Sequence, residues 1–131
     1  MSANITAMIR DCQAHRILVV DDDRDSAEAM TILLKIYGHE VATAYDGIEA
    51  IEIARMFRPD IALLDLSMPK LSGYDVARRI REEAGKPGLI LVALTGWGGE
   101  EDKRRSIEAG FNVHMVKPID FTALEKLVAE S

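Results

Sequence analysis

The chain has 131 residues, a formal net charge of −6 and one cysteine, Cys12. This length predicts one domain with a hydrophobic core, and the acidic balance argues against a protein that binds nucleic acid. A single cysteine forms neither an internal disulfide nor a cysteine metal site. No apolar run approaches the ~20 residues of a membrane span, and the N-terminus lacks the apolar core of a signal peptide, so we expect a cytoplasmic protein without membrane contact.

Residues 1–14 show no clear periodicity, and we expect a flexible lead-in before a domain that covers residues 15–131. The domain opens with an apolar run at residues 16–20. Short apolar runs bounded by turn signals are typical of strands that are buried on both faces. The first expected strand therefore ends at three consecutive acidic residues, Asp21, Asp22 and Asp23.

Four further strands alternate with five segments that show helical spacing of apolar residues. The expected strands lie at residues 39–44, 61–65, 89–94 and 112–116. The expected helices lie at residues 27–37, 46–57, 72–80, 99–109 and 120–128. Strict alternation of strands and helices argues for a parallel sheet with helices on both faces. The predicted fold is a single doubly wound α/β domain with five strands and five helices.

Several polar residues and glycines mark the expected helix ends. Asp46, Ser72 and Asp120 stand where N-caps are expected, and Asp75 follows Ser72 by three residues, as in a capping box with Asp in place of Glu. Gly38 and Gly110 follow two of the helical segments and indicate where those helices end.

The carboxyl ends of four expected strands carry polar residues: Asp21 to Asp23, Asp65, Thr95 and Lys117. In a parallel sheet these ends share one edge, where open α/β sheets bind ligands. Crowded carboxylates either take up protons or hold a cation, and a few carboxylates suit Mg²⁺. A hydroxyl and a lysine nearby suit the oxygens of a phosphoryl group. This set of residues supports phosphoryl transfer to a carboxylate, which gives an aspartyl-phosphate.

Each of these residues also has a plainer interpretation when it is taken alone. Asp65 suits a turn, and Asp23 suits the first turn of a helix, where the helix dipole favours an acid. Thr95 suits the end of a strand, and Lys117 before a proline suits a solvated loop. The combination in this order is far more specific than any single member.

At this point the sequence resembles the receiver domains of two-component response regulators, over residues 16 to about 129. The residues that carry the resemblance are Val19-Val20-Asp21-Asp22, Asp65 with Met68-Pro69 and Gly73, Thr95, and Lys117-Pro118. The resemblance implies the strand order 2-1-3-4-5, which is known for this fold. It also implies a cis peptide bond between Lys117 and Pro118.

The same resemblance implies a role for each site residue. Asp65 would accept a phosphoryl group from the phosphohistidine of a partner histidine kinase or phosphotransfer protein. Mg²⁺ would be held by Asp21, Asp22, Asp65 and the backbone carbonyl of Ser67. Thr95 and Lys117 would contact the phosphoryl group. Phosphorylation would then change the surface that binds a downstream protein partner.

The sequence departs from the family pattern at two positions. Ser67 stands where many members have Asn, and His114 stands at the position of an aromatic switch residue. His114 suits either an inward, pH-sensitive switch or a solvent-facing strand position. Two basic clusters on expected helices suit a solvated face or a docking face: Arg78, Arg79 and Arg81, and Lys103, Arg104 and Arg105. Trp97 suits either a mobile contact or packing at the sheet edge.

The leading hypothesis is a signalling switch, either a stand-alone receiver or the receiver of a hybrid histidine kinase. It is not expected to be an enzyme, because it promotes only its own phosphoryl transfer and dephosphorylation. The alternative is a phosphatase with an aspartate nucleophile, which needs a second Asp two residues later as general acid. Ser67 occupies that place and argues against it. A nucleotide-binding enzyme lacks its glycine motif here, and three acids after the first strand disfavour a flavin phosphate.

Overall fold

The computed structural model describes residues 14–66, 72–96 and 100–130. Its strands are β1 (Arg16–Val20), β2 (Glu40–Ala44), β3 (Ile61–Asp65), β4 (Ile90–Thr95) and β5 (Val113–Val116). Its helices are α2 (Arg24–Ile36), α3 (Gly47–Phe57), α4 (Gly73–Glu83), α5 (Glu100–Glu108) and α6 (Phe121–Ala129). Almost all of the expected lead-in at residues 1–14 lies outside the described ranges. None of the helices within those ranges has the length and apolarity needed to cross a membrane.

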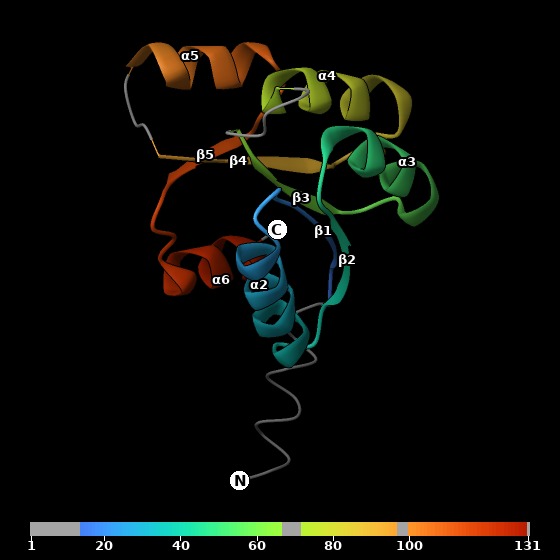
Figure 1. Ribbon diagram of the computed structural model, residues 1–131, viewed down its shortest axis with the longest axis vertical. Coiled ribbons are helices and arrows are strands. Elements are labelled where there is room, and N and C mark those ends of the chain that lie inside the picture. The colour runs from blue at the N-terminus through green and yellow to red at the C-terminus, as the bar shows by residue number, and fades with distance from the viewer. Residues whose placement is uncertain (1–13, 67–71, 97–99, 131) are drawn as a thin grey trace, which may run out of the picture.

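The five strands form one parallel sheet in the order β2-β1-β3-β4-β5. Figure 1 shows α2 and α6 on one face of the sheet and α3, α4 and α5 on the other. This arrangement confirms the doubly wound α/β fold with five strands, five helices and the order 2-1-3-4-5. Strand ends that are far apart in sequence therefore meet at one edge.

The core consists of two apolar layers, one on each face of the sheet. Leu18, Leu64 and their neighbours pack against α3 and α4, whereas Ile17, Leu63 and their neighbours pack against α2 and α6. All five residues of β3 are buried, as its near-continuous apolar sequence predicts for a central parallel strand. Each fully buried aliphatic side chain stabilises the fold by about 1.5–3 kcal/mol. The central strand is consequently a rigid support for Asp65 at its carboxyl end.

The expected helix caps are present. The side chains of Asp46 and Asp120 accept hydrogen bonds from the first turns of α3 and α6. Ser72 Oγ accepts from the backbone N–H of Asp75 at 3.2 Å and so begins α4. Gly38 and Gly110 have φ of +93° and +102°, a backbone conformation that glycine adopts without strain.

Arg81 is half-buried and hydrogen-bonded, so it does not share the solvated face that was one of the two interpretations of its basic cluster. Its guanidinium donates to the carbonyls of Leu89 and Gly110 at 2.7 and 2.6 Å and to Oδ1 of Asn112 at 2.8 Å. These bonds tie the end of α4 to the starts of β4 and β5. Sequence periodicity placed Arg81 on a helix, but it carries no information about which carbonyls lie opposite.

Candidate functional site

The edge of the sheet at the carboxyl ends of the strands carries an acidic cluster, which we define as Asp21, Asp22 and Asp65. One carboxylate oxygen from each residue lies within 4.8 Å of the others. Asp21 follows β1 and is 6% exposed, and Asp65 ends β3 and is 3% exposed, whereas Asp22 faces solvent. The sheet register brings the ends of β1 and β3 level, because Val20 pairs with Leu64.

Lys117 brings a positive charge into the acidic cluster from the end of β5. Its Nζ lies 3.0 Å from Oδ2 of Asp65 and 3.9 Å from Oδ2 of Asp21. The backbone N–H of Lys117 donates to the carbonyl of Thr95 at 2.7 Å, which fixes the end of β5 against the end of β4. The Lys117–Pro118 peptide bond is cis, as the resemblance implies.

Thr95 ends β4 at the same edge and is 5% exposed. The preceding residue, Leu94, pairs with Asp65 in the register of the sheet. The carbonyl of Leu94 also accepts the backbone N–H of Leu66 at 2.9 Å. Thr95 and Asp65 therefore lie on adjacent central strands, as the order of the strands predicts.

The electrostatics of the acidic cluster favour uptake of a cation. The pKa of Asp21 is raised to about 6, chiefly by burial, and a hydrogen bond with Asp65 and the charge of Asp65 contribute to the rise. The backbone N–H of Asp23, at 3.0 Å, and the charge of Lys117 oppose this rise. A buried pair of carboxylates that repel each other beside one solvent-facing carboxylate matches the oxygen ligands and water access that Mg²⁺ prefers.

The amino end of α4 lies directly against the strand end that carries Asp65. A Cβ atom on Gly73 would lie 2.7 Å from Cδ2 of Leu66, 2.9 Å from Cα of Leu66 and 3.0 Å from the carbonyl oxygen of Asp65. Two of these three atoms belong to the backbone, so no side-chain rotation relieves the contact. Gly73 thus allows α4 to approach the acidic cluster more closely than any other residue would.

Residues 17–129 match the family of response regulator receiver domains. The chain belongs to this family. Receiver domains are phosphorylatable signalling switches, so this assignment confirms the signalling switch of the leading hypothesis and does not favour the phosphatase alternative.

Several relatives share the receiver domain. The DNA-binding response regulator MtrA of Mycobacterium bovis is 40% identical over 108 residues, which are 82% of this chain and 46% of that protein. An uncharacterised 14.6 kDa protein of Leptolyngbya boryana is 33% identical over 114 residues, 87% of each chain. This chain thus spans about half the length of MtrA.

Solved structures show the same receiver fold. Chemotaxis protein CheY4 of Vibrio cholerae superposes with a TM-score of 0.84 at 27% identity, over 89% of this chain and 98% of that one. The receiver domain of sensor histidine kinase PA1611 of Pseudomonas aeruginosa superposes with a TM-score of 0.77 at 29% identity, over 89% and 96%. That structure has a magnesium ion coordinated in the active site cleft.

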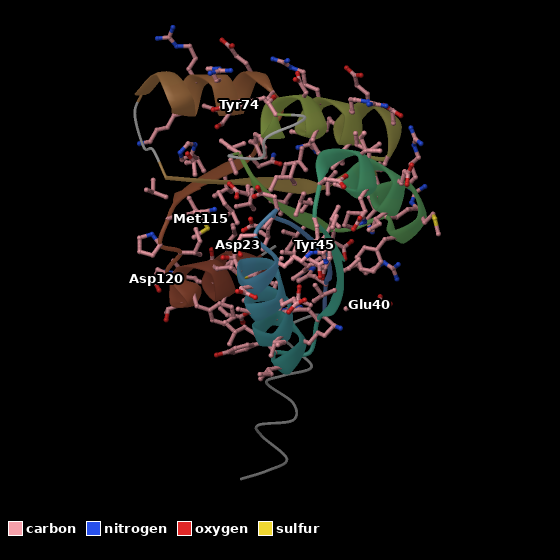
Figure 2. The ribbon with its side chains drawn as sticks, viewed as in Figure 1. Asp23, Glu40, Tyr45, Tyr74, Met115 and Asp120 are labelled. Carbon is pink, nitrogen blue, oxygen red and sulfur yellow. The ribbon has the colours of Figure 1, made fainter. Side chains whose placement is uncertain are left out.

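The sequence also predicted Asp23 and Ser67 at this edge of the sheet. Asp23 does not join the acidic cluster; its side chain caps α2 by accepting from the N–H of Asp25 at 3.2 Å and from Oγ of Ser26 at 2.8 Å, at the amino end of the helix (Figure 2). Ser67, the expected backbone ligand of Mg²⁺, lies outside the described residues, as does Trp97.

His114 on β5 is half-buried, and its Nδ1 lies 3.1 Å from Oγ of Ser106 on α5. The side chain therefore packs toward α5 and does not point freely into solvent. Sequence analysis did not single out Ser106, which is 1% exposed. A buried serine in a charged helix is the only signal that the sequence offers for this contact.

A cleft of about 290 Å³ adjoins the acidic cluster between α2 and the segment that joins β5 to α6. Asp21 and Lys117 contribute to its lining, and the other lining residues are mostly apolar, including Met30, Leu33 and Phe121. The outer surface of α2 continues this apolar character, with Ile32 58%, Ile36 72% and Tyr37 52% exposed. Leu33 and Tyr37 belong to the helical spacing of apolar residues in this segment, but they are 39% and 52% exposed.

Proposed function

We propose that this receiver domain accepts a phosphoryl group on Asp65 from a partner histidine kinase or phosphotransfer protein. The observation that carries the proposal is the position of Asp65. It ends a fully buried central strand, lies within the acidic cluster and has the Lys117 ammonium 3.0 Å from its carboxylate. A carboxylate held this rigidly is oriented for attack on an incoming phosphorus atom.

The proposed reaction moves one phosphoryl group. An oxygen of Asp65 attacks the phosphorus, the P–N bond of the donor phosphohistidine breaks, and the bonding electrons stay on the imidazole. Asp21, Asp22 and Asp65 would hold Mg²⁺, which when bound neutralises charge on the phosphoryl oxygens. Lys117 keeps a positive charge at Asp65 throughout, and the Thr95 hydroxyl donates a hydrogen bond to a phosphoryl oxygen.

The product is an aspartyl-phosphate on a switch that acts only on its own phosphoryl group. Contacts of Thr95 and Lys117 with the new oxygens would favour one of two pre-existing arrangements of the surface around α5, β5 and α6. A downstream protein partner would recognise that arrangement. Ser67 in place of a second Asp leaves no general acid for phosphatase turnover of outside substrates.

The apolar cleft beside the acidic cluster supplies the docking surface for the phosphodonor in this proposal. The donor must bring its phosphohistidine to Asp65 from the open edge of the sheet. Asp21 and Lys117 line both the site and the cleft, so a donor seated on α2 reaches the acidic cluster without crossing another element. Exposed apolar side chains on α2, such as Leu33 and Ile36, suit contact with an apolar protein surface.

Intact-mass measurement with Mg²⁺ and acetyl phosphate tests the proposal. The wild-type chain should gain the mass of one phosphoryl group, and Asp65→Asn should not. Asp23→Asn is the matched control, because Asp23 belongs to the same acidic run but caps α2, so this variant should still gain the phosphoryl group. Beryllofluoride binding measured by calorimetry covers the case of rapid hydrolysis. A wild-type chain that shows neither phosphorylation nor Mg²⁺-dependent beryllofluoride binding would overturn the proposal.

A further inference from the structure

A second group of titratable side chains lies at the opposite edge of the sheet from the acidic cluster. His15 directly precedes β1, His39 directly precedes β2, and Asp60 directly precedes β3. Glu125 joins this group from α6, which covers the same face of the sheet as α2 (Figure 1). These residues take no part in the phosphoryl chemistry proposed above.

The hydrogen bonds of His39 determine where its proton lies. The backbone N–H of His15 donates to Nδ1 of His39 at 3.1 Å. A nitrogen that accepts a hydrogen bond carries no proton, so neutral His39 holds its proton on Nε2. Nε2 lies 3.9 Å from Oε1 of Glu125, which is beyond hydrogen-bond distance. Neutral His39 is therefore bonded to the start of β1 and not to α6.

Burial makes the charged forms of His39 and Glu125 unfavourable. His15 and His39 are 8% and 7% exposed, and their rings stack with centroids 5.8 Å apart. Within the described residues, Nε2 of His15 and Oε1 of Glu125 are buried without a hydrogen-bond partner. Burial lowers the pKa of His39, and the charge of His15 lowers it further. Burial raises the pKa of Glu125.

The remaining charges nearby are already paired. Oδ2 of Asp60 lies 4.0 Å from Nδ1 of His15, but Asp60 Oδ1 pairs with Lys86 at 2.6 Å. Arg16 pairs with Glu40 at 2.7 Å next to the histidines, and Figure 2 labels Glu40 at the start of β2. From α2, the carbonyl of Leu34 accepts the backbone N–H of His39 at 3.2 Å. Glu125 is consequently the carboxylate that faces the His39 ring.

We propose that His39 is a proton-driven latch, which holds the start of β1 through His15 when neutral and exchanges this contact for Glu125 on α6 when protonated. The second proton must bind at Nδ1, where the new N–H would face the N–H of His15. Two donors repel, so the bond to His15 breaks. The imidazolium then lies beside the Glu125 carboxylate, and a shift of about 1 Å brings Nε2 and Oε1 within hydrogen-bond distance.

The latch makes the stability of the fold depend on pH with a definite sign. Because the folded pKa of His39 is lowered, its stabilising effect is fully present above the unfolded value of about 6.5 and is lost as the pH falls below it. Linkage limits this loss to about tenfold in the folding equilibrium constant per pH unit, since a single proton is involved.

Nuclear magnetic resonance of the full chain tests the latch directly. Ring ¹⁵N shifts of His39 and the backbone amide shift of His15 would be followed from pH 8 to pH 5 with EDTA present. We expect the Nε2–H tautomer at pH 8, a His39 midpoint below the ordinary histidine value, and a His15 amide that titrates with the same midpoint. An Nδ1–H tautomer at pH 8, or a His15 amide that does not follow His39, would overturn the proposal.

Two variants test separately the contact of protonated His39 with Glu125 and the effect of His39 protonation on folding. Glu125→Gln removes the charge that receives protonated His39, so the His39 midpoint should fall; an unchanged midpoint contradicts pairing with α6. His39→Asn keeps a short acceptor side chain that does not titrate, so its folding equilibrium should lose less between pH 7.5 and pH 5.5 than that of the wild type. His114→Asn, at the third histidine, is the matched control and should retain the wild-type loss.

Discussion

Asp21 is a candidate metal ligand whose buried negative charge lowers the stability of the fold. Its pKa is raised to about 6, chiefly by burial, so the folded chain at neutral pH holds an ionised carboxylate that its surroundings disfavour. A raised folded pKa means that the cost is absent below about pH 4 and grows as the pH rises through about 6. The cost in the free energy of unfolding is about 2 kcal/mol above that range.

The first prediction follows from this conflict. Asp21→Asn should raise the free energy of unfolding of the Mg²⁺-free protein at pH 7.5 by about 1–2 kcal/mol, because it removes the buried charge but keeps the shape of the side chain. Urea unfolding in EDTA measures the change. Asp23→Ala is the control in the opposite direction, since loss of the α2 cap should cost about 1 kcal/mol. A destabilised Asp21→Asn protein would contradict the electrostatic account.

Sequence analysis predicted the meeting of Asp21, Asp65 and Lys117 correctly because the ends of parallel strands must share an edge. It also indicated that Asp23 suits the first turn of a helix, and the hydrogen bonds of the Asp23 side chain at the start of α2 confirm this. The contact of His114 with Ser106 could not be predicted from the sequence, because it depends on how α5 packs against β5.

At the scale of elements, the approach of α4 to β3 is what shapes the acidic cluster from the side. Gly73 begins α4 and touches Leu66 and the carbonyl of Asp65 at distances that exclude a Cβ atom. A longer side chain there would push the helix away from the strand end. The position of Asp65 therefore depends on a helix that contributes no ligand to the cluster.

The second prediction concerns this contact. Gly73→Ala should lower the free energy of unfolding by about 1–3 kcal/mol, the usual cost of overpacking, and should weaken Mg²⁺ binding because the clash falls on the backbone beside Asp65. Urea unfolding and calorimetric Mg²⁺ titration measure the two effects. Gly96→Ala is the matched control, because a Cβ atom at Gly96 meets nothing within 4 Å. Equal behaviour of the two variants would show that the close approach is unimportant.

The third prediction concerns α2 and its proposed role in docking. Leu33→Asp places a charge on the apolar cleft and should slow phosphoryl transfer from a partner histidine kinase by about tenfold or more. Labelling by acetyl phosphate should be unchanged, because this small donor needs no docking surface. Met56→Asp on α3 is the control, since Met56 is apolar and 86% exposed but lies on a helix of the other face. Slower labelling by both donors in Leu33→Asp would indicate damage to the acidic cluster and not to docking.

For the whole molecule, the alternation of strands and helices was enough to predict the fold. Of the two edges of the sheet, however, only one could be predicted to carry a group of titratable residues. The carboxyl edge was predicted because each strand runs directly into a polar residue. The opposite edge was missed, although His15, His39 and Asp60 each precede a strand. Glu125 reaches that edge from a distant helix, and no spacing in the sequence relates it to His39.

The last prediction joins the charge of the whole chain, −6, to the chemistry of the acidic cluster. Mg²⁺ bound only by the folded state stabilises it, by about 2.7 kcal/mol at a concentration one hundred times the Kd. Because the pKa of Asp21 is about 6, protons compete with Mg²⁺ below that pH. Mg²⁺ should therefore raise the Tm at pH 8 by several degrees, and by much less at pH 5.

Thermal unfolding with and without Mg²⁺, at ionic strength matched with KCl, measures this difference at each pH. Comparing the two conditions at one pH removes the separate effect of His39, which is the same with and without the ion. Asp21→Asn should lose most of the Mg²⁺-dependent rise at pH 8, because it removes a buried ligand. If Mg²⁺ stabilises the wild type equally at both pH values, or the variant as strongly as the wild type, the cation binds elsewhere on this acidic chain and not at the cluster beside Asp65.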